Sequence, residues 1–141
     1  MDDKDAAIIQ ALERTSKLSS RAIAQQVGLP ISTVHRRIQK LEREGVIIGY
    51  KAIIDYNKTD TAIAANILIK LGDGTSKNDG IARLKQLSEV QQLINIQGVN
   101  YDLTIHVRFK NLKELSNFTE ALKAKEWIER LYTLIIIEQI I

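Results

Sequence analysis

The apolar residues of positions 1–50 recur at helical spacing in three separate segments. The first begins at Asp2 and ends between positions 14 and 17, and the second covers residues 20–27. The third lies between the turn signal of Gly28 and Pro30 and a helix stop at Gly45. Its apolar stripe, at about 100° per residue, consists of Ile31, Val34, Ile38 and Leu41. The pattern predicts three helices with a tight turn before the last, which is a helix-turn-helix.

The residue composition changes after Gly45. Residues 46–54 are mostly β-branched or aromatic, which predicts a strand or wing beside the helices. A polar run at residues 55–60 follows and marks a boundary. We therefore expect two domains, a helix-turn-helix domain with its wing over residues 1–55 and a second domain over residues 56–141.

In the rest of the chain, segments whose apolar residues have the spacing of a strand alternate with segments that have the spacing of a helix. Every second residue from Asp102 to Phe109 is apolar, which predicts a half-buried antiparallel strand. Further strands are predicted from about Ala62 to the turn at residues 72–74, over residues 90–97 and within residues 128–141, with helices at about 78–88 and 112–122. The order β-α-β-β-α-β predicts a ferredoxin-like domain with an antiparallel sheet, so the chain belongs to the α+β class.

The last predicted strand is apolar on both faces, from Leu134 to Ile137. An open four-stranded sheet with helices on one face leaves the other face uncovered, and here that face is partly apolar. We hypothesise that two copies pair through these sheets in a two-fold dimer. Such a dimer presents two copies of the third predicted helix, which is the recognition helix of a helix-turn-helix, to successive major grooves of DNA.

The net charge of the chain is only +3, but cations are concentrated in the third predicted helix. Against the single acid Glu42, residues 31–43 contain Arg36, Arg37, Lys40 and Arg43. Such a local concentration of positive charge attracts a polyanion more strongly than a slight excess of positive charge over the whole chain does. Because Arg36 and Arg43 lie almost opposite the apolar stripe, the helix has one face for a core and one cationic face. For this helix taken alone, an ordinary solvated face is the alternative.

We expect the cationic face to bind double-stranded DNA in the major groove. Base-edge and phosphate contacts are expected from Ser32, Thr33, Arg36 and Lys40. Arg36 is the candidate for a bidentate contact to guanine. Arg43 and Arg37 are expected to reach the DNA backbone, although Arg37 lies nearer the apolar stripe and could instead form a structural ion pair. At the start of the second helix, donors to phosphate are expected from Ser19, Ser20 and Arg21.

The motifs of residues 19–50 resemble those of the Lrp/AsnC (leucine-responsive, feast/famine) transcriptional regulators. The chain spells S-x-R-x-I-A-x-x-V from Ser19 to Val27, and then G-L-x-x-S-T-V-x-x-R-x-x-x-L-E-x-E-G-V-I-x-G-Y from Gly28 to Tyr50. The resemblance implies a transcriptional regulator that forms dimers, often assembles into octamers, and binds an effector in its C-terminal domain. One position departs: Pro30 replaces a capping serine, so the hydroxyl cap is lost, while proline still fits a first helical turn.

The loop before the alternating strand is the candidate effector site. It combines a flexible backbone with donors, acceptors and a carboxylate suited to a free amino acid, in Gly98, Val99, Asn100, Tyr101 and Asp102. A plain β-turn is the alternative, since Gly, Asn and Asp are turn formers. The resemblance implies a Gly-x-Tyr-Asp effector loop between subunits here, opposite the last strand, whose polar candidates are Tyr132 and Thr133. This chain has one residue more between its glycine and its tyrosine.

The sequence lacks the residues that disulfides, metal sites and catalytic sites require. The chain has no cysteine, so disulfides and thiolate metal sites are excluded. His35 and His106 lie in different halves and are expected as a helix-surface residue and a sheet residue, so we predict no metal site and no catalytic dyad. Because no phosphate-binding glycine loop or nucleophile motif is present, we expect neither an enzyme nor a cofactor. With no signal peptide or membrane-spanning run, the expected location is the cytoplasm.

Two other functions remain open at this point. The ferredoxin-like domain could sense a small molecule and regulate an enzyme, with the helical domain as a docking module. Alternatively, the chain could compact DNA with little preference for sequence. The cationic face of the third helix favours specific DNA binding over the first of these.

Overall fold

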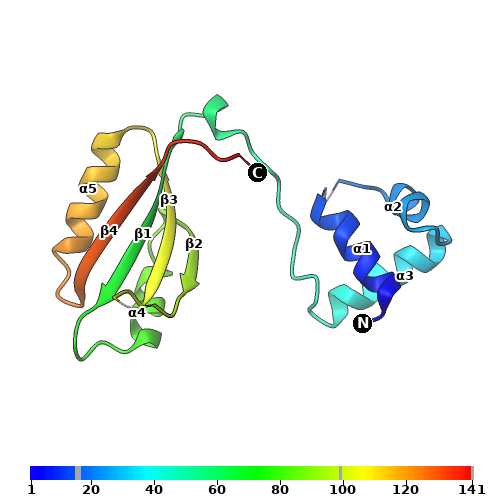
Figure 1. The fold of residues 1–141 in the computed structure, drawn as a ribbon, viewed down its shortest axis with the longest axis horizontal. Helices are drawn as coiled ribbons and strands as arrows, with labels where there is room; N and C mark the ends of the chain where they lie inside the picture. The colour runs from blue at the N-terminus through cyan, green and yellow to red at the C-terminus, as the bar shows by residue number, and fades with distance from the viewer. Residues whose placement is uncertain (15–16, 99, 141) are drawn as a thin grey trace. The chain divides into compact units, whose positions relative to one another are not determined.

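The computed structural model describes residues 1–14, 17–98 and 100–140. The chain divides into two compact units, Met1–Ile54 and Asp55–Ile141. Each unit has a hydrophobic core of its own. Figure 1 shows a helical first unit and a second unit in which helices accompany a sheet.

The first unit is a bundle of α1 (Asp3–Arg14), α2 (Ser20–Val27) and α3 (Ile31–Arg43). Its core joins these helices through Ile8, Ala11, Ile23, Ala24 and Val34. Between α2 and α3, Gly28 adopts a left-handed conformation with a φ of 67°, and its N–H donates to the carbonyl of Ala24. Glycine tolerates this conformation without strain, so the chain turns sharply and forms the predicted helix-turn-helix.

The start of α3 differs from the prediction in two ways. Pro30 is the N-cap residue, with φ of −58° and ψ of 142°, and lies just before the first turn. Its carbonyl accepts the N–H of Val34, and its side chain makes no cap hydrogen bond, which agrees with the expected loss of a hydroxyl cap. Ile31, expected in the buried stripe, is 46% exposed, because it lies at the helix end outside the core cluster that buries Val34.

Residues 46–54 do not form the strand that their composition predicted. The structure describes all of these residues, and none of them is in a strand. A strand needs a second strand to exchange hydrogen bonds with, and no described strand pairs with this segment. Its apolar side chains are therefore uncovered: Ile48 is 94% exposed and Ile53 is 87% exposed. Of the predicted strand or wing, the strand was therefore wrong.

The second unit begins with a short 3-10 helix, η1 (Tyr56–Lys58). It then has the predicted order β-α-β-β-α-β, in β1 (Ile63–Leu71), α4 (Lys77–Leu84), β2 (Val90–Asn95), β3 (Leu103–Phe109), α5 (Leu112–Lys123) and β4 (Ile128–Ile136). The strands form one antiparallel sheet in the order β2-β3-β1-β4. This ferredoxin-like arrangement confirms the α+β class.

Three elements of this unit, α4, β2 and β4, end earlier than predicted, and β2 ends at Asn95 and not at residue 97. α4 ends at Leu84 and not near Ser88, because tighter turns follow, in which the N–H of Leu87 donates to the carbonyl of Leu84. β4 ends at Ile136, where its pairing with β1 reaches Ala64. Residues 137–140 extend beyond the paired part of β1, so they form no ladder hydrogen bonds with a described strand.

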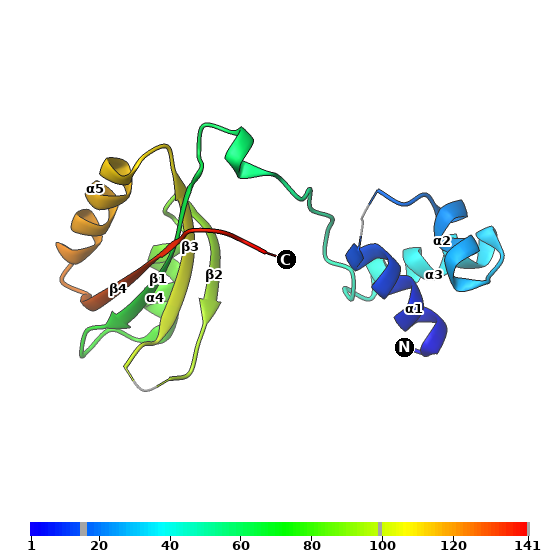
Figure 2. The same cartoon turned by 45° about the horizontal axis from the view of Figure 1, so that its top comes forward.

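One face of the sheet is buried against α4 and α5, and the other is open (Figure 2). Every second residue of β3 is buried, which confirms the predicted alternation. The buried face shares one core with both helices, including Ile67, Ile69, Leu103, Ile105, Leu84 and Leu122. By strand register, the apolar residues of the open face include Leu68, Ile94, Tyr132 and Leu134.

Candidate nucleic-acid interface and effector region

α3 presents a polar face to solvent, on the side away from the buried Val34 and Leu41. Along its middle, at successive spacings of four, three and four positions, lie the exposed residues Ser32, Arg36, Gln39 and Arg43. Lys40 lies on the flank of this face, and Thr33 is half-buried beside it. The structure therefore brings three of the predicted contacts together. Sequence reasoning missed Gln39, although its spacing from Arg36 was visible.

Two cations on this face have no acidic partner in the part of the chain that the structure describes. Within residues 1–14, 17–98 and 100–140, Arg36 and Arg43 form no ion pair. Lys40 Nζ lies 3.8 Å from Glu44 Oε1, and both side chains are about half exposed, so this pair is weak. An exposed face with unneutralised arginines attracts phosphates.

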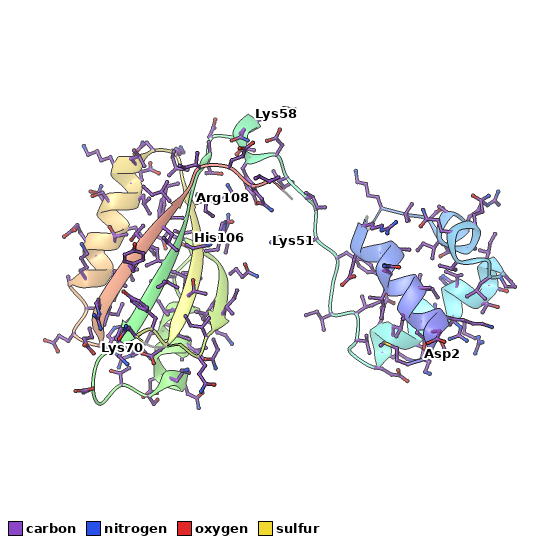
Figure 3. The ribbon with its side chains drawn as sticks, in the orientation of Figure 1. Asp2, Lys51, Lys58, Lys70, His106 and Arg108 are labelled. Atoms are coloured by element: carbon purple, nitrogen blue, oxygen red, sulfur yellow. The ribbon has the colours of Figure 1, made fainter. Side chains whose placement is uncertain are left out.

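Arg37 instead lies on the core side of α3, where it forms an ion pair with α1. Its Nη1 is 2.7 Å from Asp5 Oδ1 and 2.8 Å from Asp2 Oδ2, and its side chain is 19% exposed. Each aspartate also accepts the backbone N–H of the other, at 3.1 and 2.9 Å. The Arg37 hydrogen bond, followed by that from the Asp2 backbone, lowers the pKa of Asp5. Arg37 thus forms the structural ion pair that was one of its two expected roles. Asp2 is labelled at the start of α1 in Figure 3.

The predicted phosphate donors at the start of α2 lie together. Ser19 is the N-cap, and its Oγ accepts the N–H of Ala22 at 3.2 Å. This bond uses a lone pair of the hydroxyl oxygen and leaves the hydroxyl proton for another acceptor. Arg21 is exposed and Ser20 is half-buried. The positive end of the helix dipole favours an anion at this position.

The predicted effector loop ends in Asp102, which is bound to the neighbouring strand. Its N–H donates to the carbonyl of Ile69 at 2.8 Å, and its Oδ2 accepts the N–H of Leu71 at 2.8 Å. Lys70 Nζ lies 3.7 Å from the same oxygen. Gly98 and Asn100 are exposed, whereas Val99 lies outside the described residues. The carboxylate that was expected to hold a ligand is thus already engaged in joining the loop to β1.

Tyr132 and Thr133, predicted together as polar candidates of the last strand, point to opposite faces of the sheet. Tyr132 pairs with Leu68 on the open face, and Thr133 pairs with Ile67 on the helix-covered face. The cause is the period of two of a β-strand. The ring centroid of Tyr132 lies 6.4 Å from that of Tyr101, so Tyr132 is beside the loop. Thr133 faces away from this aromatic pair.

Three cationic residues that the sequence reasoning did not single out, Arg130, Lys70 and Lys77, lie near Tyr101 or Asp102 of the loop. The guanidinium of Arg130 lies 5.8 Å from the centre of the Tyr101 ring. A pocket of about 240 Å³ is lined by Asp102 together with Lys70, Gly72, Asp73, Thr75 and Lys77, at the end of β1 and the turn after it. Because most of these residues are polar, the pocket suits a small charged ligand better than an apolar one.

The open face of the sheet carries further polar contacts. His106 Nδ1 lies 2.8 Å from Asn66 Oδ1, and the guanidinium of Arg108 lies 3.7 Å from the centre of the Tyr56 ring. Figure 3 labels His106 and Arg108 on β3, and His106 is a sheet residue as predicted. In the part of the chain that the structure describes, no cluster of acids and histidines could hold a metal ion, and no helix could span a membrane.

A helix-turn-helix whose last helix carries exposed, unneutralised arginines is characteristic of DNA-binding proteins. The comparison with known families agrees with this class for the first unit. Residues 1–48 match the family model described as winged helix-turn-helix DNA-binding. Residues 64–141 match the model described as the Lrp/AsnC ligand binding domain.

Individual relatives have the same organisation. The HTH-type transcriptional regulator FL11 of Pyrococcus furiosus is 32% identical over 98% of this chain and 90% of its own length. A solved AsnC family transcriptional regulator from Agrobacterium tumefaciens has a TM-score of 0.83 at 26% identity, covering 99% of this chain and 92% of that one. The regulator NMB0573 of Neisseria meningitidis, solved as an L-Met complex, shares the fold, with a TM-score of 0.87 at 20% identity over 99% and 92% of the two chains. The chain belongs to the Lrp/AsnC family of HTH-type transcriptional regulators.

Proposed function

We propose that this regulator binds operator DNA by placing α3 in the major groove. The observation that carries the proposal is the exposed face of α3, on which Arg36 and Arg43 have no acidic partner among the described residues. Arg36 contacts guanine, and Ser32, Thr33 and Lys40 contact neighbouring base edges and phosphates. The backbone contacts come from Arg43, Ser19, Ser20 and Arg21. Arg37 is not among them, because its guanidinium forms ion pairs with Asp2 and Asp5 at the start of α1.

The regulator acts as a dimer in which two copies pair through the open faces of their sheets. On this face Ile94, Tyr132 and Leu134 are 44%, 54% and 44% exposed. A second copy covers such apolar area and removes it from water. A two-fold dimer also presents two copies of α3, as a site with two half-sites requires. The family resemblance favours further assembly, up to octamers.

The second unit binds an amino-acid effector that changes the affinity for DNA. Support comes from the match to the Lrp/AsnC ligand binding domain and from the L-Met complex of the Neisseria regulator. The proposed site lies around Tyr101, Asp102 and Tyr132, with Gly98 and Asn100 at its rim. Because Asp102 already accepts a backbone N–H, an effector's ammonium group has to share this carboxylate. The regulator acts by binding, without a chemical step, in the cytoplasm.

Binding to the chain's own promoter tests the proposal. Fluorescence anisotropy compares that fragment with random DNA of equal length, at several salt concentrations and with each natural amino acid in turn. We expect a preference for the promoter, an affinity that falls steeply with salt, and a shift with at least one amino acid. Equal affinity for both DNAs indicates DNA compaction and contradicts specific regulation. Absence of binding to both contradicts the DNA-binding role itself.

A further inference from the structure

The outward face of α3 carries one side chain that presents a donor and an acceptor in a held orientation. Gln39 Nε2 lies 3.1 Å from Nε2 of His35, which is one helical turn earlier. Both residues are exposed. We infer that Gln39 recognises an adenine of the operator and that His35 is its positioning residue. The inference rests on the proposed insertion of α3 into the major groove.

The contact with His35 determines which atoms of Gln39 remain for a partner. An amide nitrogen only donates, so in this contact the Nε2 of His35 is the acceptor. One N–H and the Oε1 of Gln39 then remain on the same planar amide. Adenine presents an acceptor, N7, beside a donor, its N6 amino group, on the major-groove edge. The free donor and acceptor of Gln39 therefore match adenine with two hydrogen bonds.

Gln39 lies on the line of residues that faces away from the core. It follows Arg36 by three positions and precedes Arg43 by four, so at about 100° per residue the three side chains share one face. Val34 and Leu41, which are 0% and 1% exposed, hold the opposite side of the helix in the bundle. A groove contact by Arg36 therefore brings Gln39 to the bases as well.

The spacing of Arg36 and Gln39 predicts where the adenine lies. Three residues of an α-helix rise about 4.5 Å, and successive base pairs are about 3.4 Å apart. If Arg36 contacts a guanine, Gln39 reaches a base pair one or two steps away. Arginine presents only donors, whereas Gln39 presents one donor and one acceptor, so the two side chains select different bases.

Solvation alone is the competing explanation for an exposed glutamine. The two explanations differ in what a change of its chemistry does. Gln39→Glu replaces the amide donor by a second acceptor, and a carboxylate accepts a hydrogen bond from the amino group of cytosine. Recognition therefore predicts a change of the preferred base, whereas solvation predicts none.

Selection of binding sites from a random double-stranded pool, by the full chain, tests the inference. For the wild type we expect an adenine one or two positions from a guanine. Gln39→Ala should reduce the preference for that adenine about tenfold to a hundredfold and leave the guanine preference unchanged. Gln39→Glu should move the preference toward cytosine, and His35→Ala should weaken it at this position alone. The matched control is Gln10→Ala, which removes an exposed amide on α1 and should select the wild-type site.

The outcomes separate the inference from the proposed function. If the wild type selects a site and both Gln39 variants select the same site, Gln39 recognises no base and the inference is overturned, while DNA binding stands. If the wild type selects no site, the proposed function and the inference fail together. If His35→Ala weakens random and selected DNA equally, His35 contacts phosphate and is not a positioning residue.

Discussion

Nη1 of Arg37 lies 2.7 Å from Oδ1 of Asp5, whose side chain is only 4% exposed. The contact joins α3 to the first turn of α1, across 32 positions of the chain. Arg36, the preceding residue, is exposed and faces away from the bundle. Two adjacent arginines of the recognition helix therefore have different roles, one in the fold and one in the proposed DNA contact.

Arg37→Ala is expected to lower the thermal stability of the helical unit. The substitution leaves the buried carboxylate of Asp5 without its cationic partner, and an unpaired buried charge is unfavourable. Circular dichroism during heating should show an unfolding midpoint several degrees below that of the wild type. Arg36→Ala is the matched control and should keep the wild-type midpoint, because its side chain is exposed. Equal midpoints for both variants would contradict a structural role of Arg37.

The same contact predicts a loss of stability in acid. The pKa of Asp5 is lowered, first by the hydrogen bond from Arg37 and then by that from the Asp2 backbone. The unfolded chain thus binds a proton at a higher pH than the folded chain. This stabilisation is complete above the unfolded carboxyl value of about 3.9 and is lost as the pH falls through the lower folded value. Denaturant titrations across this range should show a smaller acid loss for Asp5→Asn, and an unchanged loss would refute the link.

Arg36→Ala and Arg43→Ala are expected to weaken DNA binding in different ways. Arg36→Ala should remove about 1–3 kcal/mol of discrimination at one base pair, because it deletes a bidentate base contact. Arg43→Ala should weaken all sequences alike and reduce the salt slope by about one, because it deletes a phosphate contact. Anisotropy on a selected operator and on random DNA measures both effects. If Arg36→Ala lowers the affinity for both DNAs equally, Arg36 contacts the DNA backbone and not a base.

Asp102→Ala is expected to destabilise the second unit. The N–H of Leu71 loses its acceptor, which costs about 1–3 kcal/mol when the group is shielded from water. Asp102→Asn keeps an oxygen for this N–H and loses only the attraction to Lys70, so its effect should be smaller. Denaturant unfolding measures both variants, with Asp73→Ala as an exposed control. Wild-type stability in Asp102→Ala would show that the carboxylate is free for a ligand.

Leu134→Lys is expected to convert the proposed dimer into a monomer. The change places a charge on the open face of the sheet, where a second copy would have to desolvate it. Light scattering at micromolar concentration measures the mass. Leu112→Lys changes another exposed leucine, on α5, and should leave the dimer intact. A dimer that persists in Leu134→Lys would place the interface elsewhere.

Local periodicity was enough to predict much of the fold. In β3, buried and open positions alternate strictly, so the sequence pattern revealed both the strand and its buried face. The same period of two would have separated Tyr132 from Thr133, had it been applied to the last strand. Helical spacing likewise would have added Gln39 to the face that contains Arg36.

Other features depend on residues that are distant in the sequence. Arg37 meets partners 35 and 32 positions away, so no local pattern could choose between an ion pair and a DNA contact. Asp102 is engaged by the N–H of Leu71, 31 positions earlier, which composition does not reveal. Residues 46–54 have the composition of a strand but no described strand to pair with. For Arg37 and Asp102 the missing information was the identity of the tertiary partner, and for residues 46–54 it was that no described strand pairs with them.

The turn between α2 and α3 also bears on the thermodynamics of DNA binding. The ring of Pro30 limits its φ to values near the −58° that it adopts, so the unfolded chain has less conformational freedom at this position. Gly28 sets the other side of the turn in a single left-handed conformation. The direction in which α3 leaves the turn is thus defined before DNA arrives, and docking requires little further ordering of the backbone. In the proposed complex, the conformational entropy lost on binding is therefore mainly that of the long side chains of Arg36, Lys40 and Arg43.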